Sequence, residues 1–312
     1  MSYECCLYHG KALASYGFPD HPFGIDRHDV FMDAAEKDGL LDRVAHGLPQ
    51  VASVQQIEAF HTHDYVDKVK RLSATGQGLL DLGDTPAFKG VYEAAATVVG
   101  TVLQALSDIM SARYRRAFVP IAGLHHARRE IASGFCVFND CGVLIETLRR
   151  QYNMRKVAYV DIDAHHGDGV FYAFEDDPDL IFADLHEDGR FLYPGTGFAQ
   201  ETGRGKAKGT KLNIPMRMQA NDADFLQAWE QVESHLHEHP IEFILFQCGA
   251  DSMAGDPITD MVYSEQSHAY AAKRLRVLAD QYTDGRLLAM GGGGYNRDNL
   301  ARAWCAVLEQ MA

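Results

Sequence analysis

The stretch Val157–Gly169, VAYVDIDAHHGDG, places acidic and histidine side chains on a segment that otherwise has the pattern of a buried strand. In an extended strand, side chains at alternate positions share one face, so Asp161, Asp163 and His165 would point the same way. Two carboxylates on one apolar face are costly to bury unless a positive group pairs with them, and a metal ion with an imidazole as its next ligand is the simplest such group. The alternative is that the strand has already ended and the polar residues form a solvated loop.

Further apolar strands alternate with amphipathic helices along the chain. We expect strands at Ala117–Gly123, in a segment ending near His186, in a segment ending at Asp251, and at 287–290. Helices are expected between them, over residues 29–41, 66–72, 95–106, 139–151, 225–236, 264–282 and 300–308. This alternation predicts a mostly parallel sheet with helices on both faces, in which ligands bind at the carboxyl ends of the strands.

Three segments give weak signals. The chain up to about Pro49 has few regular patterns, and the basic, glycine-rich segment Gly203–Lys211 is interpreted as a solvated loop. The histidines at 235, 237 and 239 resemble a metal-binding tract, but at helical spacing they do not converge, so a solvated helix end is the preferred interpretation.

Composition narrows the class of protein. With 312 residues, of which 46% are apolar and 23% charged, the chain can bury a large core, and we expect a single α/β domain over residues 1–312. A net charge of −14 makes it a poor direct binder of nucleic acid or anionic membrane. No apolar run is long enough to span a bilayer and the N-terminal residues do not resemble a signal peptide, so a cytoplasmic location is expected. The six cysteines form no CxxC pair and are predicted to be buried, reduced thiols.

Chemically active side chains recur where the predicted strands end. Asp163, His165 and Asp251 would form a site with three protein ligands and an open position, which is the arrangement of catalytic zinc. Oxygen and nitrogen ligands of this kind would also accept Fe(II), Co(II) or Mn(II), so the residues do not fix the metal. A metal here could activate water and polarise a carbonyl oxygen.

Amide hydrolysis also needs a base, an acid and an oxyanion donor. His125 and His126 could supply the first two, with Asp161 and Asp168 orienting the imidazoles, and Tyr295 could donate its phenol to the oxyanion. The glycine run 291–294 before Tyr295 allows close backbone approach. A phosphate cradle is the alternative for this run, but it lacks the GxGxxG spacing and the Walker lysine.

Five stretches together carry a family resemblance: HHARREIASGFCVFND, YVDIDAHHGDGV, LHEDGRFLYPGTG, GADSMAGDP and GGGGYN. In this set and order, which spans nearly the whole chain, the sequence resembles the histone deacetylase superfamily, closest to class I-type enzymes and bacterial acetoin-utilisation deacetylases. The resemblance implies an arginase-deacetylase fold, a single eight-stranded parallel sheet flanked by helices. It also implies hydrolysis of ε-acetyl-lysine or a related acylated amine to free amine and acetate.

The resemblance also implies individual roles. Zinc would be held by Asp163, His165 and Asp251. His126, paired with Asp168, would be the general base and acid, and His125, paired with Asp161, its electrostatic partner, while Tyr295 polarises the carbonyl. The remaining implied positions are the acyl-lysine tunnel (Gly134, Phe135 and Tyr193), the rim that holds the substrate backbone (Asp84), and the acetate-release channel (Arg27).

Two positions depart from the family pattern. The family binds potassium beside the zinc through residues matching Asp161, Asp163, His165 and Leu185, with a hydroxyl residue before the leucine, whereas this chain has Asp184 there. Tyr193 stands where phenylalanine is common and adds a hydroxyl to the tunnel wall.

Two other functions remain open. An acetylpolyamine amidohydrolase would use the same catalytic set and suits an acidic protein, and a catalytically silent acyl-lysine binding module would need no turnover. The substrate partner is therefore either an acylated protein lysine or a small acylated amine. The sequence does not decide between them, nor does it decide the acyl-chain preference, the metal used in the cell or the oligomeric state.

Overall fold

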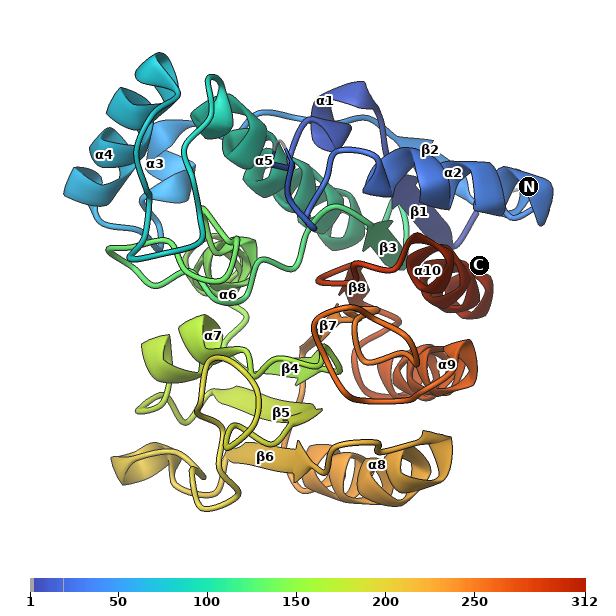
Figure 1. The fold of residues 1–312 in the computed structure, drawn as a ribbon. Coiled ribbons are helices and arrows are strands. Elements are labelled where there is room, and N and C mark those ends of the chain that lie inside the picture. The colour runs from blue at the N-terminus through green and yellow to red at the C-terminus, as the bar shows by residue number, and fades with distance from the viewer. Residues whose placement is uncertain (1–2, 19) are drawn as a thin grey trace.

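One parallel sheet organises the molecule (Figure 1). The computed structural model describes residues 3–18 and 20–312. Eight strands are found among these residues, in the order β2-β1-β3-β8-β7-β4-β5-β6, and every neighbouring pair is parallel. Their bounds are β1 Cys5–Tyr8, β2 Ala45–Gly47, β3 Arg116–Val119, β4 Val157–Asp161, β5 Leu180–Glu187, β6 Lys211–Met216, β7 Phe243–Gln247 and β8 Leu287–Met290. The expected parallel α/β sheet is confirmed.

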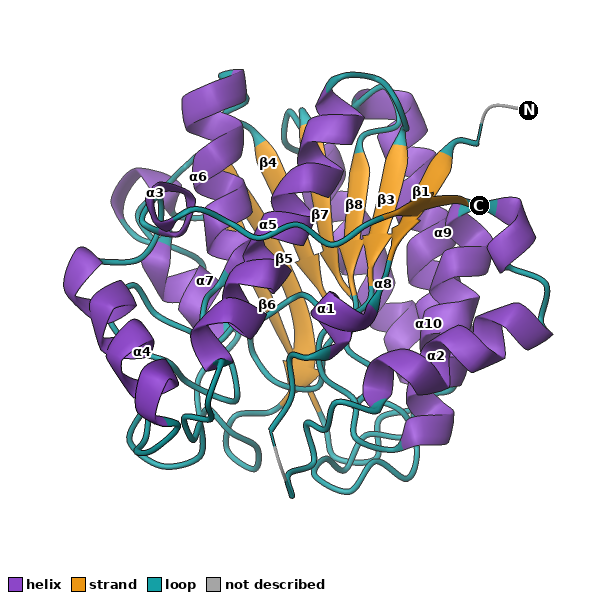
Figure 2. Ribbon diagram, turned by 90° about the horizontal axis from the view of Figure 1, so that it is seen from above, coloured by secondary structure: helices purple, strands orange, loops and turns teal. Residues whose placement is uncertain are grey.

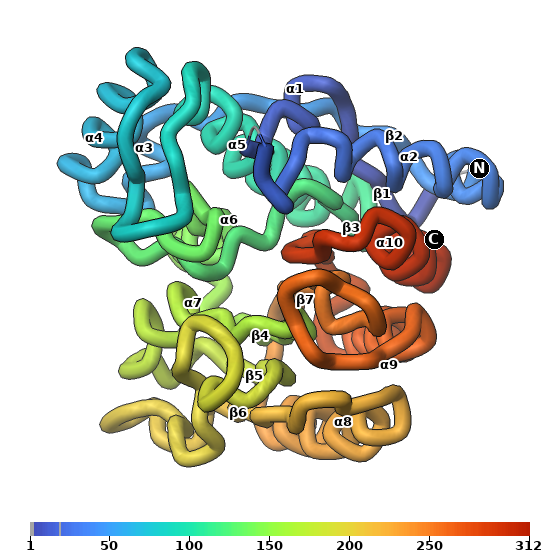
Figure 3. The backbone as a smooth tube through the Cα atoms, in the orientation of Figure 1, coloured from blue at the N-terminus to red at the C-terminus, as the bar shows by residue number. Residues whose placement is uncertain are grey.

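Helices cover both faces of this sheet. In Figure 1, α2, α8, α9 and α10 lie on one side of the strands, while α5, α6 and α7 lie on the other. Figure 3 shows that the first and last parts of the chain meet, because α2 lies beside α10. The helices are α1 Lys11–Ala14, α2 Arg27–Lys37, α3 Val54–Ile57, α4 His63–Thr75, α5 Val91–Met110, α6 Asp140–Tyr152, α7 Asp168–Ala173, α8 Asp222–His237, α9 Glu265–Tyr282 and α10 Arg297–Met311, with short 3₁₀ turns at Leu41–Arg43 and Gly205–Ala207.

The long helices begin at residues whose side chains satisfy free backbone N–H groups. Asn139 caps α6, Ser264 caps α9, and Asn296 accepts from the N–H groups of Asp298 and Asn299 at the start of α10. The cap at Asn296 directly follows the candidate catalytic Tyr295 and so fixes where the glycine-rich loop gives way to the helix. Within the described residues, no helix is both long enough and apolar enough to cross a membrane.

The core contains all six cysteines. Each is buried and free of any disulfide, which confirms the prediction of reduced thiols. Burial raises the pKa of every one of these thiols, to about 11 for Cys6 and to about 12 for Cys305. A cysteine nucleophile is therefore disfavoured.

Three of the observed strands, β1, β2 and β6, were not predicted from the sequence. β1 and β2 lie in the part of the chain that gave few regular signals, and they are too short, at four and three residues, to show a period. β6 begins at Lys211, so the expected solvated loop Gly203–Lys211 was wrong at its end. Lys211 is buried, and its Nζ donates to the carbonyls of Asp177 and Leu180 at 2.9 and 2.8 Å.

Other expectations need smaller corrections. β3 ends at Val119, before Pro120, rather than at Gly123, and β7 ends at Gln247, so Asp251 lies in the following loop. The histidines at 235, 237 and 239 do not all lie in solvent, because His235 is on the buried side of α8.

The opening stretch is itself shorter as a strand than expected. β4 ends at Asp161, so Asp163 and His165 do not share a strand face with it but lie in the loop that follows. This loop is not the solvated alternative either, since residues 162–167 are all buried. Figure 2 shows long loops gathering at one end of the sheet, and register places Asp161 opposite both Asp184 and Gln247 at this end. The carboxyl ends of β4, β5 and β7 therefore meet where the polar residues lie.

Candidate active site

A buried cluster of three potential metal ligands lies beyond β4 and β7. Nδ1 of His165 is 3.1 Å from Oδ1 of Asp163 and 3.1 Å from Oδ2 of Asp251. One ligand atom from each residue can be chosen so that all lie within 4.8 Å of one another. The structure thus brings together the three residues that the sequence singled out as ligands, although they come from the loops after β4 and β7 rather than from the strands themselves.

The electrostatics of this cluster suit a divalent cation. Burial alone would lower the pKa of His165, but hydrogen bonds with Asp163 and Asp251 outweigh it and raise that pKa to about 10. Burial and the charge of Asp163 raise the pKa of Asp251 to about 7. Without a metal, the two carboxylates therefore keep the imidazole of His165 protonated at neutral pH, and Asp251 is itself partly protonated there. Two carboxylates and one imidazole nitrogen are a donor set that zinc accepts.

Backbone groups and one amide fix the carboxylates. Oδ2 of Asp163 accepts from Nε2 of Gln247 at 2.9 Å and from the N–H of Gly293 at 2.8 Å. Oδ1 of Asp251 accepts from the N–H of Ala164 at 2.9 Å. Sequence reasoning missed Gln247, although a polar residue closing the apolar strand FILFQ was a usable signal.

Two histidine–carboxylate pairs lie beside the cluster. Nδ1 of His125 is 2.8 Å from Oδ2 of Asp161, and Nδ1 of His126 is 2.7 Å from Oδ1 of Asp168. The two Nε2 atoms are 3.1 Å apart, so both rings present the same nitrogen to one small region. Burial, followed by the neighbouring His125, lowers the pKa of His126 to about 4. His126 is consequently neutral near pH 7 and able to accept a proton.

Asp168 has a second partner that sequence reasoning missed. Its Oδ2 accepts from Nη2 of Arg128 at 3.3 Å, while its Oδ1 faces His126. Burial would raise the pKa of Asp168, but the hydrogen bond from His126 and the nearby positive groups together outweigh it and hold that pKa below its usual value. The carboxylate is therefore ionised and can hold the imidazole in one orientation.

Tyr295 lies in the same cavity as the two histidines. The lining of this cavity also includes Phe23, Gly134, Asp163, His165 and Gly293. The N–H of Tyr295 donates to Oδ2 of Asp256 at 2.8 Å, which holds the start of the residue in place. Burial raises the pKa of its phenol well above the usual value, so the group keeps its proton and can donate it in a hydrogen bond. Asp256 was not identified from the sequence.

The predicted tunnel residues lie around this cavity. The ring centroids of Phe135 and Tyr295 are 6.0 Å apart, and those of Tyr193 and His126 are 5.2 Å apart. The hydroxyl of Tyr193 contacts that of Ser133. Tyr193 and Asp84 both line a neighbouring surface hollow with Leu82, Arg128, Ile131 and Ala132. The structure therefore places the rim and tunnel candidates next to one another.

Arg27 is buried behind the glycine run. Its Nε donates to the carbonyl of Gly294 at 3.0 Å and its Nη2 to the carbonyl of Gly292 at 2.6 Å. The guanidinium also lies over the ring of Phe23, 4.0 Å from its centroid. These contacts fasten the loop that carries Tyr295, and a role in acetate release stays a prediction.

Asp161 and Asp184 form a second concentration of buried charge. Asp184 accepts from the N–H of Gly167 at 2.9 Å and lies 2.6 Å from Nδ1 of His186. Burial, and then the charge of Asp184, raise the pKa of Asp161 well above its usual value. A monovalent cation beside these carboxylates would relieve that repulsion, and a potassium site here stays a prediction.

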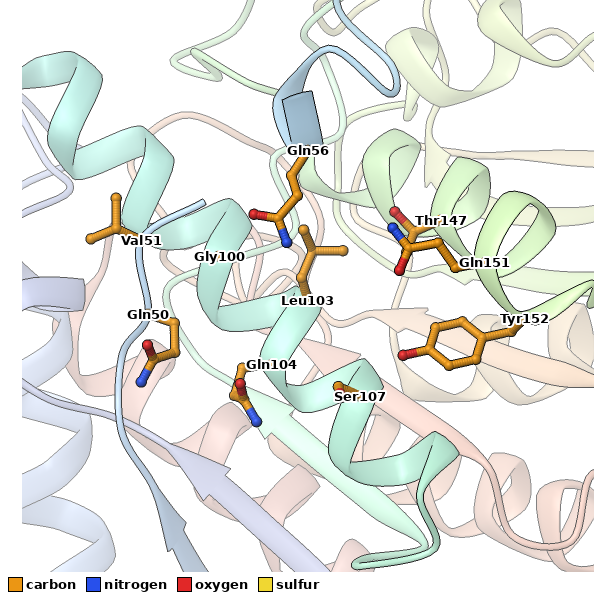
Figure 4. Close-up of a pocket in the computed structure, with 10 residues that line it drawn as sticks. All are labelled: Gln50, Val51, Gln56, Gly100, Leu103, Gln104, Ser107, Thr147, Gln151 and Tyr152. Carbon is orange, nitrogen blue, oxygen red and sulfur yellow. The ribbon is translucent and has the colours of Figure 1, made fainter. Parts of the chain in front are cut away.

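A separate hollow lies between α5, α6, α3 and the segment before α3 (Figure 4). Uncharged side chains surround it, and Figure 4 shows amides and hydroxyls facing one another across the space. It shares no residue with the cavity around Tyr295. Its lining comprises Gln50, Val51, Gln56, Gly100, Leu103, Gln104, Ser107, Thr147, Gln151 and Tyr152.

Comparison with known proteins gives consistent matches over nearly the whole chain. Residues 21–311 match the family model described as the histone deacetylase domain. The chain is 36% identical over 319 residues to the acetoin utilization protein AcuC of Bacillus subtilis (strain 168), an alignment covering 99% of this chain and 80% of that protein. It is 33% identical over 306 residues to AcuC of Staphylococcus aureus (strain MSSA476), covering 95% and 78%. A probable deacetylase of Archaeoglobus fulgidus is 31% identical over 294 residues, covering 93% and 80%.

Proposed function

The chain belongs to the histone deacetylase family, and from that premise we propose that it is a metal-dependent amidohydrolase that removes the acetyl group from ε-acetyl-lysine or a related acylated amine. The family supports deacetylation and a metal cofactor. The observation that carries the finer proposal is the convergence of both histidine–aspartate pairs, the Asp-His-Asp cluster and Tyr295 around one cavity. We treat residues 1–312 as one catalytic domain.

Asp163, His165 and Asp251 would hold the metal, and zinc is the first choice, with Fe(II) or Co(II) compatible with the same donors. When bound, the metal supplies Lewis acidity toward the amide carbonyl and lowers the pKa of water. Potassium would lie close by, with the carboxylate of Asp184 taking the place of the family's hydroxyl residue and Leu185 contributing its carbonyl.

The protein's own residues supply the proton transfers. His126 enters the reaction neutral, because its pKa is about 4, and accepts a proton from water while Asp168 stabilises the imidazolium that forms. The proton can then pass to the leaving amine. His125, held by Asp161, stabilises charge from the other side, and the Tyr295 phenol donates a hydrogen bond to the developing oxyanion.

Substrate binding is assigned to the tunnel and rim. Gly134, Phe135 and Tyr193 would surround the aliphatic chain of the acyl-lysine, and Asp84 would accept hydrogen bonds from the substrate backbone. Burial and the hydrogen bond with Asp81 raise the pKa of Asp84 to about 6, so this carboxylate is mostly ionised at neutral pH.

Measuring acetate release from two substrates distinguishes the proposed deacetylase from the acetylpolyamine amidohydrolase and the silent binding module. Protein of measured zinc content would be given an acetyl-lysine peptide and, in parallel, acetylputrescine. Faster turnover of the peptide supports the proposal, whereas a clear preference for acetylputrescine would assign an acetylpolyamine amidohydrolase. Peptide binding without acetate release would assign a silent acyl-lysine binding module.

A further inference from the structure

The backbone of the tunnel residue Phe135 adopts a conformation that side chains rarely permit. Its φ is +66°, and the preceding Gly134 also has a positive φ of +52°. Successive residues in this region persist only where the surrounding structure fixes them. The orientation of the Phe135 ring toward the cavity therefore depends on whatever holds its two peptide groups.

A threonine hydroxyl holds the N–H side. The N–H of Phe135 donates to Oγ1 of Thr85 at 3.1 Å, and the same hydroxyl donates to Oδ2 of Asp81 at 2.6 Å. Thr85 is fully buried. A hydroxyl has one proton to donate. Because the Thr85 hydroxyl donates it to the nearer carboxylate, that of Asp81, its oxygen is left to accept from the N–H of Phe135. The direction of this hydrogen-bond chain is thus fixed by Asp81.

A tyrosine hydroxyl holds the carbonyl side. Tyr16 donates to the carbonyl of Phe135 at 2.8 Å and accepts from the N–H of Val137 at 3.0 Å. Tyr16 is also buried and lies more than a hundred positions earlier in the chain. Both peptide groups of Phe135 are therefore bound by hydroxyls from segments distant in sequence.

The carboxylate of Asp81 also holds the turn that carries the rim residue Asp84. Oδ1 of Asp81 accepts from the N–H groups of Gly83, Asp84 and Thr85 at 2.9, 3.1 and 3.0 Å. Asp84, the candidate that would hold the substrate backbone, is thus tied into the turn that delivers the Thr85 hydroxyl to Phe135. One short network connects the mouth of the tunnel to its wall.

We infer that Thr85, oriented by Asp81, is a positioning residue that sets the distance between the rim carboxylate of Asp84 and the tunnel ring of Phe135. This inference rests on the proposed function. Thr85 has no hydrogen bond with the metal-ligand cluster or the histidine–aspartate pairs among the described residues. Its loss should therefore weaken substrate binding and leave the chemical step largely intact, which separates it from a catalytic residue.

The test uses three substitutions. Thr85→Val keeps the shape and removes the hydroxyl, and Thr85→Ser keeps the hydroxyl. Thr97→Val is the matched control, because Thr97 is buried in α5 and its hydroxyl donates only within its own helix, to the carbonyl of Glu93 at 2.7 Å. The parameters kcat and KM are measured separately for an acetyl-lysine peptide and for acetylcadaverine, which has the acylated chain but no peptide backbone.

For the peptide, we expect Thr85→Val to raise KM by about 3- to 10-fold, the effect of one neutral hydrogen bond, with a much smaller change in kcat. The rise should be smaller for acetylcadaverine, which cannot contact Asp84 through a backbone. Thr85→Ser and Thr97→Val should remain close to wild type. Because KM does not depend on the fraction of folded enzyme, partial unfolding of Thr85→Val cannot imitate this result.

Two outcomes overturn the inference while leaving the proposed function in place. One is a wild-type KM in Thr85→Val, whether or not kcat falls; the other is a Thr85→Ser variant as impaired as Thr85→Val. Wild-type protein that hydrolyses neither substrate would overturn the proposed function, and the inference with it.

Discussion

Gly249 packs its backbone against the carboxylate of Asp163 so closely that a Cβ at position 249 would lie 2.0 Å from Oδ2. That carboxylate is also bound by Gln247 and by the N–H of Gly293. The position of a candidate metal ligand is thus fixed by the absence of a side chain on a neighbouring loop. No periodic pattern in the sequence expresses such a constraint.

Gly249→Ala should accordingly displace Asp163 and weaken metal binding. We expect the affinity for zinc to fall by about 10- to 100-fold, the range seen when groups that orient metal ligands are lost. Equilibrium dialysis against buffered zinc measures this directly. Gly83→Ala is the control, since a Cβ there meets nothing within 4 Å and its φ lies outside the left-handed region. Equal zinc affinity in Gly249→Ala and wild type would contradict the assignment of Asp163 as a ligand.

Tyr295→Phe should lower kcat by about 10²- to 10³-fold while zinc content stays unchanged, because it removes an oxyanion donor and no metal ligand. Turnover of an acetyl-lysine peptide and atomic absorption on the same sample provide the two readings. Tyr263→Phe is the matched control: its hydroxyl is buried without a hydrogen-bond partner among the described residues, so little should be lost. Near-normal turnover in Tyr295→Phe would remove the residue from the mechanism.

Zinc binding should become weaker as the pH falls. The pKa of His165 in the metal-free protein is about 10, so the imidazole is protonated at pH 8 and must lose that proton to become a ligand. Between pH 7 and 10 we expect an affinity change of about tenfold per pH unit, with roughly one proton released per zinc bound. Below about pH 7 the dependence should steepen, because Asp251 also becomes protonated.

Calorimetry at pH 8 in buffers of different ionisation enthalpy counts the released protons. A binding enthalpy independent of the buffer would show that His165 is already neutral and would refute the proposed coupling between the imidazole and its two carboxylates.

Potassium should stabilise the fold through Asp184. Replacing tetramethylammonium chloride with potassium chloride at constant ionic strength should raise the melting temperature, since a ligand at 100 times its Kd contributes about 2.7 kcal/mol. Asp184→Asn keeps the shape but removes the charge and should lose most of this rise. If wild type and Asp184→Asn respond equally to potassium, the cation does not bind at this position.

Several of the residues that the sequence could identify occur in pairs or runs at the ends of apolar strands. His125 and His126 follow β3, and Asp163 and His165 follow β4, so the rule that parallel strands present ligands at one edge was sufficient to group them. Single polar residues were missed where their partners are distant in sequence. Asp256 contacts the N–H of Tyr295, 39 positions away, and although it lies in the stretch GADSMAGDP, nothing in that stretch indicates its partner.

The fold was predictable to a similar degree. The central strands β4, β5, β7 and β8 are long enough or apolar enough to be recognised, and they carry the site. The edge strands β2 and β6 and the strand β1 beside β2 were not recognised. β1 and β2 have only four and three residues, and β6 has mixed burial and a proline, so none of them defines a period. Only the family resemblance implied the full count of eight.

The shielding of all six cysteines turns the protein into its own reporter of opening. A thiol reagent that releases a coloured product meets Cys141 and Cys248, both 0% exposed, only after the helices separate from the sheet, so the slow phase of colour development measures opening of the interior. The rates of colour development can then be compared between samples stripped of zinc by a chelator and samples loaded with zinc. The difference measures how much metal binding at one edge of the sheet slows opening of the interior.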